Sequence, residues 1–199
     1  MTKTRIGIMG GTFDPIHYGH LVIAEAARYA FSLDKVIFIP AGSPPHKRNS
    51  RHTEAVARAE MVALAIASNP HFDFSLMEVQ RSGFSYSVDT VTAITEEYHN
   101  AADIYFITGA DAVLDVATWY QPERLISLCR FVAATRPGFD LTKLDKLPTQ
   151  WRAKIDVMEI PGLDISSTDI RLRVKENKPI KYLLPEPVEE YIYQHQLYK

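Results

Sequence analysis

Short apolar runs alternate with longer amphipathic stretches along most of the chain. The apolar runs are rich in isoleucine, valine and phenylalanine, which is typical of buried strands. They predict strands at Thr4–Met9, Lys35–Pro40, Phe72–Ser75, Ile104–Thr108, Arg130–Thr135 and Lys154–Glu159. The stretches between and after them predict helices at Gly19–Phe31, Thr53–Ala67, Ser87–Tyr98, Asp111–Val116, Pro122–Leu128, Leu141–Lys154, Ser167–Glu176 and Pro187–Gln194.

This alternation predicts an α/β protein with a Rossmann-like, doubly wound parallel sheet. Helices are expected on both faces, with a small C-terminal helical portion packed against them. The 199 residues fit a single domain spanning 1–199. Ligands of such sheets bind beyond the carboxyl ends of the strands. The loops that begin at Gly10, Ala41, Gly109 and Arg136 should therefore share one edge.

Composition narrows the range of partners. The formal net charge is -2, so binding of nucleic acid or an anionic membrane is not favoured, and phosphate binding must be local. No apolar run approaches the roughly 20 residues that span a bilayer. The single cysteine, Cys129, allows no intrachain disulfide, which suits a reducing cytoplasm, and it is expected to be a buried apolar side chain rather than a catalytic thiol. The oligomeric state is left open, a homo-oligomer included.

The first chemical motif follows the first predicted strand, and reads Gly10-Gly11-Thr12-Phe13-Asp14-Pro15-Ile16-His17-Tyr18-Gly19-His20. It is neither a G-x-G-x-x-G dinucleotide fingerprint nor a P-loop. A helix that begins here offers free backbone N–H groups to a phosphate, and His17 and His20 can reach one side of its first turn. Two structural histidines or a metal-binding pair are the alternatives, although no third ligand stands nearby. Asp14 is expected to cap the following turn, and Thr12 to offer its hydroxyl to a phosphate.

A second cluster comprises Ser166, Ser167, Thr168 and Arg171. One of the hydroxyls is expected to cap the helix that follows, while the others and the guanidinium suit phosphate oxygens. A third candidate is Lys47, in the proline-stiffened loop 42–48. Lys47 and Arg171 are both expected to be exposed cations without structural partners in the free protein.

The run His17-x-Gly19-His20 and the later run Ile165–Arg171 together resemble the HxGH and ISSTxIR signatures of the nucleotidyltransferase superfamily. Within it, the chain resembles the family of bacterial nicotinate-nucleotide adenylyltransferases from Ile6 to about Leu184. The resemblance implies transfer of AMP from ATP to nicotinate mononucleotide, giving nicotinate adenine dinucleotide and pyrophosphate. Mg²⁺ would be carried mainly by the ATP phosphates, with no metal site on the protein.

The resemblance also implies three sets of site residues. The catalytic set is His17, His20, Lys47 and Arg171. The ATP-binding set is Gly10, Gly11, Thr12, Phe13, Gly109, Asp111, Ser166, Ser167 and Thr168. The acceptor-binding set is Ser87, Trp119, Tyr120 and Arg136. From the residues alone, Asp111 is also a candidate N-cap, and an aromatic pair is more often part of a core.

Alternative functions remain at this point. The same reaction type is possible with nicotinamide mononucleotide, phosphopantetheine, or a sugar or glycerol phosphate as acceptor. A non-catalytic nucleotide-binding module is another alternative, which the intact histidine pair and Arg171 disfavour. A nucleic-acid-binding module is disfavoured because the chain has no basic stripe.

Overall fold

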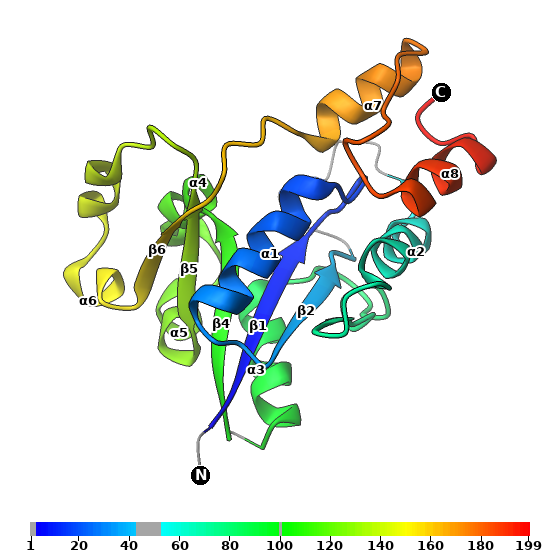
Figure 1. Ribbon diagram of the computed structural model, residues 1–199. Helices are drawn as coiled ribbons and strands as arrows, with labels where there is room; N and C mark the ends of the chain where they lie inside the picture. Colours follow the sequence, from blue (N-terminus) through cyan, green and yellow to red (C-terminus); the bar gives the residue numbers. More distant parts are fainter. Residues whose placement is uncertain (1–2, 43–52, 100) are drawn as a thin grey trace.

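A six-stranded parallel sheet organises the protein, and its strand order is β3-β2-β1-β4-β5-β6 (Figure 1). The computed structural model describes residues 3–42, 53–99 and 101–199. The strands are β1 (Thr4–Gly11), β2 (Lys35–Pro40), β3 (Phe72–Phe74), β4 (Ala102–Gly109), β5 (Arg130–Thr135) and β6 (Ile155–Glu159). The order reverses between β1 and β4, so the carboxyl ends of these two strands form the switch point where such sheets bind ligands.

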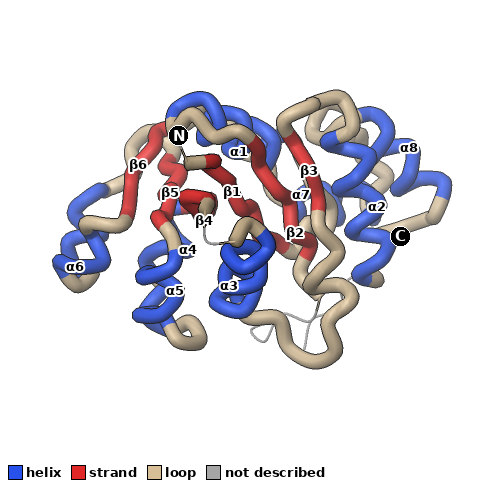
Figure 2. The backbone as a smooth tube through the Cα atoms, turned by 90° about the horizontal axis from the view of Figure 1, so that it is seen from below, coloured by secondary structure: helices blue, strands red, loops and turns tan. Residues whose placement is uncertain are grey.

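Helices cover both faces of the sheet, which confirms the doubly wound fold (Figure 2). On one face the core includes residues from α1 (Tyr18–Ala30), α2 (Ala55–Ile66), α7 (Ser167–Lys175) and α8 (Glu186–Gln194). On the other face the core includes residues from α3 (Ser87–Glu97), α4 (Ala110–Leu114) and α5 (Pro122–Leu128). A short 3-10 turn, η2 (Val116–Thr118), joins α4 to the loop before α5.

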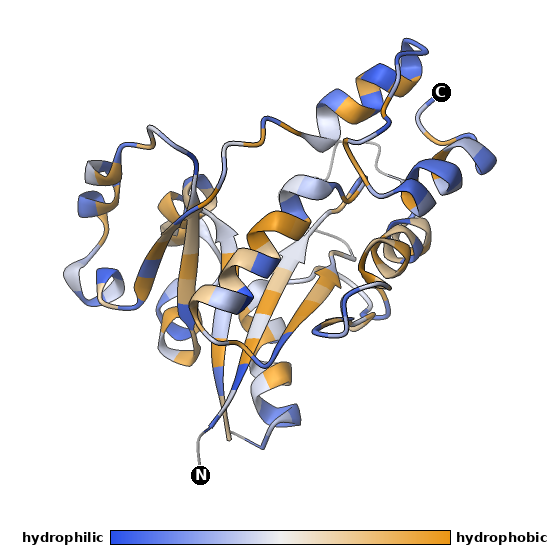
Figure 3. Cartoon of the chain, in the orientation of Figure 1, coloured by the Kyte–Doolittle hydropathy of each residue, from blue (hydrophilic) through white to orange (hydrophobic). Residues whose placement is uncertain are grey.

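The strands supply both cores because successive side chains point to opposite faces. On β4, Ile104 and Phe106 belong to the core beneath α3, whereas Tyr105 and Ile107 belong to the core beneath α1. Strands buried on both sides read as continuous apolar runs, and β2 and β5 are largely orange, the hydrophobic colour, in Figure 3. This double burial explains why β2 and β5 in particular were visible in the sequence.

One helix prediction was wrong. The stretch Leu141–Lys154 is not one helix but two short elements, the 3-10 helix η3 (Leu141–Lys146) and α6 (Thr149–Arg152). Pro148 lies between them and adopts an extended conformation, as does Leu147 before it. Proline disfavours the helical conformation of the residue that precedes it, so the helix breaks there. In the described part of the chain no helix is long and apolar enough to cross a membrane.

Candidate active site

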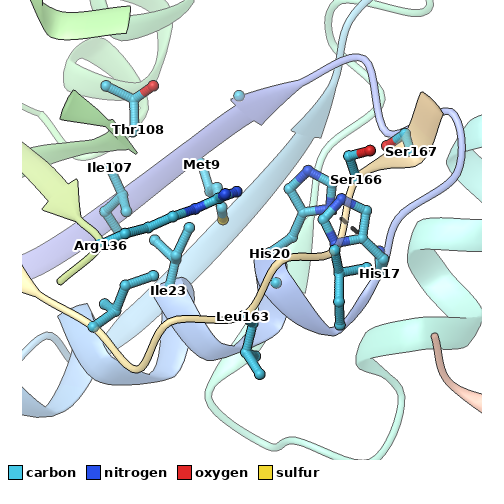
Figure 4. A pocket seen from close by; sticks show the side chains of 15 residues that line it. Met9, His17, His20, Ile23, Ile107, Thr108, Arg136, Leu163, Ser166 and Ser167 are labelled. Carbon is cyan, nitrogen blue, oxygen red and sulfur yellow. Dashed lines mark hydrogen bonds between the residues drawn. The ribbon is translucent and has the colours of Figure 1, made fainter. Parts of the chain in front are cut away.

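Two imidazole rings lie face to face where α1 begins. His17 is the N-cap of the helix, and its ring centroid lies 3.8 Å from that of His20, with 31° between the planes (Figure 4). The backbone N–H of His17 donates to Nδ1 of His20 at 3.2 Å. Because Nδ1 accepts this bond, the neutral His20 ring carries its proton on Nε2 and can donate it to a ligand.

Gly19 makes this ring arrangement possible. A Cβ at Gly19 would lie 2.9 Å from both Cε1 and Nδ1 of the His17 ring, which is too close. His17 is 6 % exposed, and its Nδ1 is buried without a hydrogen-bond partner among the described residues. The glycine between the two histidines is therefore required sterically, because any side chain would displace the imidazole.

Burial keeps both rings uncharged at neutral pH. Desolvation, assisted by the charge of Arg136, lowers the pKa of His17 from 6.5 to about 4. Desolvation, and then the neighbouring His17, lowers the pKa of His20 well below 6.5. In the free protein the pair thus presents neutral N–H donors rather than two positive charges.

Acid should destabilise the fold through His17. The unfolded chain takes up a proton near pH 6.5 and the folded chain only near pH 4, so the stabilisation is complete above 6.5 and is lost as the pH falls toward 4. This window corresponds to roughly 3 kcal/mol. Urea unfolding at a series of pH values should therefore give a shallower acid slope for His17→Gln than for the parent. Equal slopes would contradict the buried neutral state.

The start of α7 docks against the same loop. The Ser166 side chain caps α7 by accepting from the Asp169 N–H at 3.1 Å, as expected for one of the hydroxyls. The Ser167 hydroxyl donates to the Pro15 carbonyl at 2.8 Å. Both serines lie beside the two histidines in Figure 4. The two motifs, far apart in sequence, therefore meet at one cavity.

Arg171 does not fit the expectation of a free exposed cation. Its guanidinium donates to the Asp14 carbonyl at 2.7 Å and to the Thr168 hydroxyl at 3.2 Å. The expectation was wrong because the loop before His17 runs beside α7, which a sequence does not reveal. Lys47, the other cation of the pair, lies outside the described residues.

Two expected caps are also corrected. The Asp14 carboxylate does not cap the turn that follows it, because it is buried and accepts from the Thr53 N–H and the Tyr198 hydroxyl instead. Asp111 is not an N-cap, since Gly109 occupies that position of α4 and Asp111 lies in the first turn. Asp111 is exposed, so its carboxylate is available to a ligand.

Three neighbouring cavities in the described part of the chain lie along the carboxyl edge of the sheet. The histidine cavity, about 350 Å³, is lined by residues including Gly10, His17, His20, Arg136, Ser166 and Ser167. The aromatic cavity, about 350 Å³, is lined by residues including Gly10, Gly11, Thr12, Ser87, Trp119 and Tyr120. The Asp111 cavity, about 500 Å³, is lined by residues including Gly109, Asp111, Thr135, Arg136, Gly138 and Lys143. Shared lining residues place the histidine cavity next to each of the other two.

The aromatic cavity combines flat rings with a helix N-terminus. The rings of Tyr86 and Tyr120 lie 4.4 Å apart between centroids, and Trp119 packs edge-on against the core ring of Phe106 at 5.9 Å. Tyr86 is the N-cap of α3, so the first helical residue, Ser87, places its backbone N–H at the positive end of that helix. This cavity is suited to an aromatic ring that carries an anionic group.

Two of the predicted site residues, Arg136 and Phe13, do not lie with the other residues of the sets to which the resemblance assigned them. Arg136 lines the histidine and Asp111 cavities and does not line the aromatic cavity, where the other three acceptor residues lie. Phe13 is buried, and its ring packs edge-on against His20 at 5.0 Å. It therefore supports the histidine ring from behind rather than lining one of the three cavities.

The sequence analysis missed three buried polar side chains around this site. Arg58 is only 2 % exposed and donates to the carbonyls of Thr12 and Ala41, both at 2.6 Å. The Glu78 carboxylate accepts from Thr90 at 2.6 Å, and burial raises its pKa. The missed residues are Arg58, Glu78 and Ser85. A signal existed for Arg58, because it sits on the apolar stripe of α2.

Arg58 should be important for stability. Arg58→Met keeps the apolar stem but removes the donated bonds that join the loop after β1, the end of β2 and the Thr53 carbonyl before α2. Losing charge-assisted bonds in a buried setting should lower the free energy of unfolding by about 2–4 kcal/mol. Urea denaturation measures this change. The exposed Arg124→Met is the control, expected within about 0.5 kcal/mol of the parent; equal effects of the two changes would contradict the assignment.

The parallel α/β fold and the paired histidines fit the class of nucleotidyltransferases, and comparison with known proteins agrees with that class. The cytidylyltransferase-like family model matches residues 8–173, so the chain belongs to that family. A relative from Moorella thermoacetica, named as a probable nicotinate-nucleotide adenylyltransferase, is 58% identical over 199 residues, with 98% of this chain and 92% of the relative covered. A relative of the same name from Thermoanaerobacter sp. is 51% identical over 201 residues, covering 99% and 95%.

A solved structure shares the fold. The nicotinic acid mononucleotide adenylyltransferase of Plasmodium falciparum, determined in complex with NaAD, superposes with a TM-score of 0.80. It is 22% identical, and the match covers 98% of this chain and 97% of that one. At this identity the similarity concerns the fold.

Proposed function

We propose that the protein transfers the AMP part of ATP to nicotinate mononucleotide, forming nicotinate adenine dinucleotide and pyrophosphate. The observation that carries the proposal is the pair of stacked imidazoles at the start of α1, facing the hydroxyls at the start of α7. Relatives named for this activity, 51% and 58% identical over nearly the whole chain, support it.

The reaction needs no covalent enzyme intermediate. A phosphate oxygen of the mononucleotide attacks the α-phosphorus of ATP, while the bond from that phosphorus to the oxygen bridging to the β-phosphate breaks. The attacking phosphate is already ionised, so no general base is required. Catalysis then depends on aligning the two phosphates and on stabilising negative charge as it moves to the leaving pyrophosphate.

The histidine cavity offers donors suited to that charge. The neutral rings of His17 and His20 present N–H groups, and the Ser166 hydroxyl beside them accepts from the Asp169 N–H and still has its own proton to donate, whereas Ser167 donates its proton to the Pro15 carbonyl. Binding of a polyphosphate raises the pKa of a nearby imidazole, because an opposite charge favours its protonated form. The pair can thus be neutral in the free protein and gain positive charge as ATP binds. Arg136 adds a fixed cation at the cavity.

The two flanking cavities suit the two ends of the product. We assign the aromatic cavity, with Trp119, Tyr120 and the start of α3, to the pyridine ring and its carboxylate. We assign the Asp111 cavity to the adenosine, with the exposed carboxylate of Asp111 accepting from ribose hydroxyls. The histidine cavity between them then holds the reacting phosphates.

Mg²⁺ enters this proposal as part of the substrate. The groups at the histidine cavity are imidazoles, hydroxyls and a guanidinium, which bind phosphate oxygens, whereas Mg²⁺ prefers oxygen ligands and carboxylates. Across the described ranges, no group of three or more His, Cys, Asp or Glu side chains is placed to hold a metal ion. We propose that the protein uses ATP as its Mg²⁺ complex, with the metal held mainly by the ATP phosphates.

A pyrophosphate-release assay tests the proposal. The purified protein is given MgATP and, in turn, nicotinate mononucleotide, nicotinamide mononucleotide, phosphopantetheine or glycerol phosphate. We expect the highest kcat/KM with nicotinate mononucleotide, and formation of the dinucleotide in a one-to-one ratio with pyrophosphate. Turnover with phosphopantetheine or glycerol phosphate but with neither pyridine nucleotide would overturn the acceptor assignment, and ATP binding without turnover would indicate a non-catalytic module.

A further inference from the structure

The carboxylate of Asp14 connects the loop before His17 to a segment near the far end of the sequence. The Tyr198 hydroxyl donates to Oδ1 of Asp14 at 2.8 Å, across 184 positions of sequence. The Thr53 N–H donates to Oδ2 at 3.3 Å. Asp14 is only 3 % exposed, so water does not substitute freely for these bonds. In Figure 1 the last segment of the chain lies at the same end of the molecule as the start of α1.

The main chain of the same short segment is held from other directions. Arg58 donates to the Thr12 carbonyl, Arg171 to the Asp14 carbonyl, and Ser167 to the Pro15 carbonyl. These bonds hold carbonyl oxygens, whereas Tyr198 holds a side chain. The segment 12–15 leads directly into His17, so its position decides where the imidazole lies.

Tyr198 is itself well anchored. Its ring and Leu197 pack against the apolar core that also contains residues of α1 and α2. Burial raises the pKa of the Tyr198 hydroxyl, which therefore stays protonated and donates to the carboxylate. A buried hydrogen bond to an ionised acceptor is among the stronger ones, and its geometry is restrictive.

We propose that Tyr198 is a positioning residue for the transfer reaction: through the Asp14 carboxylate, its hydroxyl holds the segment 12–15 so that His17 faces the reacting phosphates. The part of this inference that concerns the reaction rests on the proposed function. The placement of the His17 ring does not, and it can be measured without turnover.

The experiment compares two tyrosine-to-phenylalanine changes. Tyr198→Phe removes the bond to Asp14, and the matched control Tyr191→Phe removes a hydroxyl bond to the Glu60 carboxylate, which lies on α2 away from the three cavities. We expect Tyr198→Phe to lower kcat about tenfold with KM for both substrates within about twofold, because alignment rather than ground-state binding is lost. Tyr191→Phe should keep kcat within about twofold of the parent.

A double-mutant cycle links the effect to Asp14. Asp14→Ala removes both carboxylate oxygens and should lower kcat at least as much, and adding Tyr198→Phe to it should lower kcat no further, because in that background the hydroxyl has no carboxylate to hold. If the losses in kcat from the two single changes multiply in the double variant, the proposal is overturned. An unchanged kcat in Tyr198→Phe, or equal losses in Tyr198→Phe and Tyr191→Phe, would overturn it as well.

NMR titration of the free protein separates this proposal from the proposed function. The His17 ring has a pKa of about 4 because it is buried. If Tyr198 holds the loop, Tyr198→Phe lets water reach the ring, and this pKa rises toward the ordinary value of a solvated imidazole. An unchanged His17 pKa in Tyr198→Phe overturns the positioning role. If the parent protein shows no AMP transfer, the proposed function fails, and the titration still decides the role of Tyr198.

Discussion

Replacing His17 by alanine is expected to lower kcat by roughly 10²–10³-fold, the usual effect of removing a donor that stabilises charge in the transition state. The ring is buried at the start of α1 and stacked on His20, so it is already oriented before ATP arrives. A donor of this kind contributes mostly when charge moves to the leaving pyrophosphate. The loss should therefore appear in kcat and in kcat/KM together, with a smaller change in KM for ATP.

Steady-state kinetics of pyrophosphate release measures this effect. His71→Ala serves as the control, because that histidine is exposed and lies in the loop before β3, and its kcat should match the parent. A tenfold rise in KM for ATP with unchanged kcat would show that His17 is only a ground-state ligand. His17→Ala also removes a buried ring, so circular dichroism must confirm that the variant remains folded under the assay conditions.

The parent protein is expected to prefer nicotinate mononucleotide over nicotinamide mononucleotide by about 10²–10⁴-fold in kcat/KM. The two acceptors differ only by a carboxylate against a neutral amide on the same ring. In the aromatic cavity the start of α3 directs backbone N–H groups near Tyr86 and Ser87 at the position proposed for that group. Charge-assisted bonds from such donors contribute roughly 1.5–3 kcal/mol each, and the amide leaves one donor facing its own NH₂ group.

Two variants separate the carboxylate from the ring. Ser87→Ala should narrow the ratio of the kcat/KM values for the two acceptors, because the Ser87 hydroxyl lies at the same helix start. Trp119→Phe should weaken the binding of both acceptors by the same factor, since the stacking face is identical for the two pyridine rings. Phenylalanine is the better replacement than alanine because Trp119 also packs against the core rings of Phe106 and Phe131. Equal kcat/KM values for the two acceptors in the parent would mean that the carboxylate pocket does not exist.

The buried hydroxyl of Ser85 faces the same pocket. It lines the aromatic cavity and, within the described part of the chain, is buried without a hydrogen-bond partner. A buried hydroxyl in that state gains a bond when a polar ligand arrives. Ser85→Ala should therefore weaken acceptor binding more than it lowers the melting temperature, which kinetics and thermal unfolding of the same sample can compare.

Local patterns were sufficient for most of the fold. The strands β2 and β5 have the predicted bounds, and α1, α3 and α7 begin within a residue of their predicted starts. The strands β2 and β5 were predictable because they are buried almost throughout, and α7 because Ser166 caps its start. Where a local signal was overlooked, as with Pro148 inside the stretch Leu141–Lys154, the prediction failed.

The sequence by itself also indicated the two motifs that we propose bind phosphate, because their residues stand close together along the chain. The tertiary structure alone decided what connects them. Arg58 reaches Thr12, Arg171 reaches the Asp14 carbonyl, and Tyr198 reaches the Asp14 carboxylate across 184 positions. No local pattern encodes such bonds, since whether a charged side chain is buried or solvated depends on which distant segment packs over it. The residues proposed to carry out the chemistry therefore stand in short stretches of sequence. The hydrogen bonds that fix their positions form only when distant segments of the chain pack together.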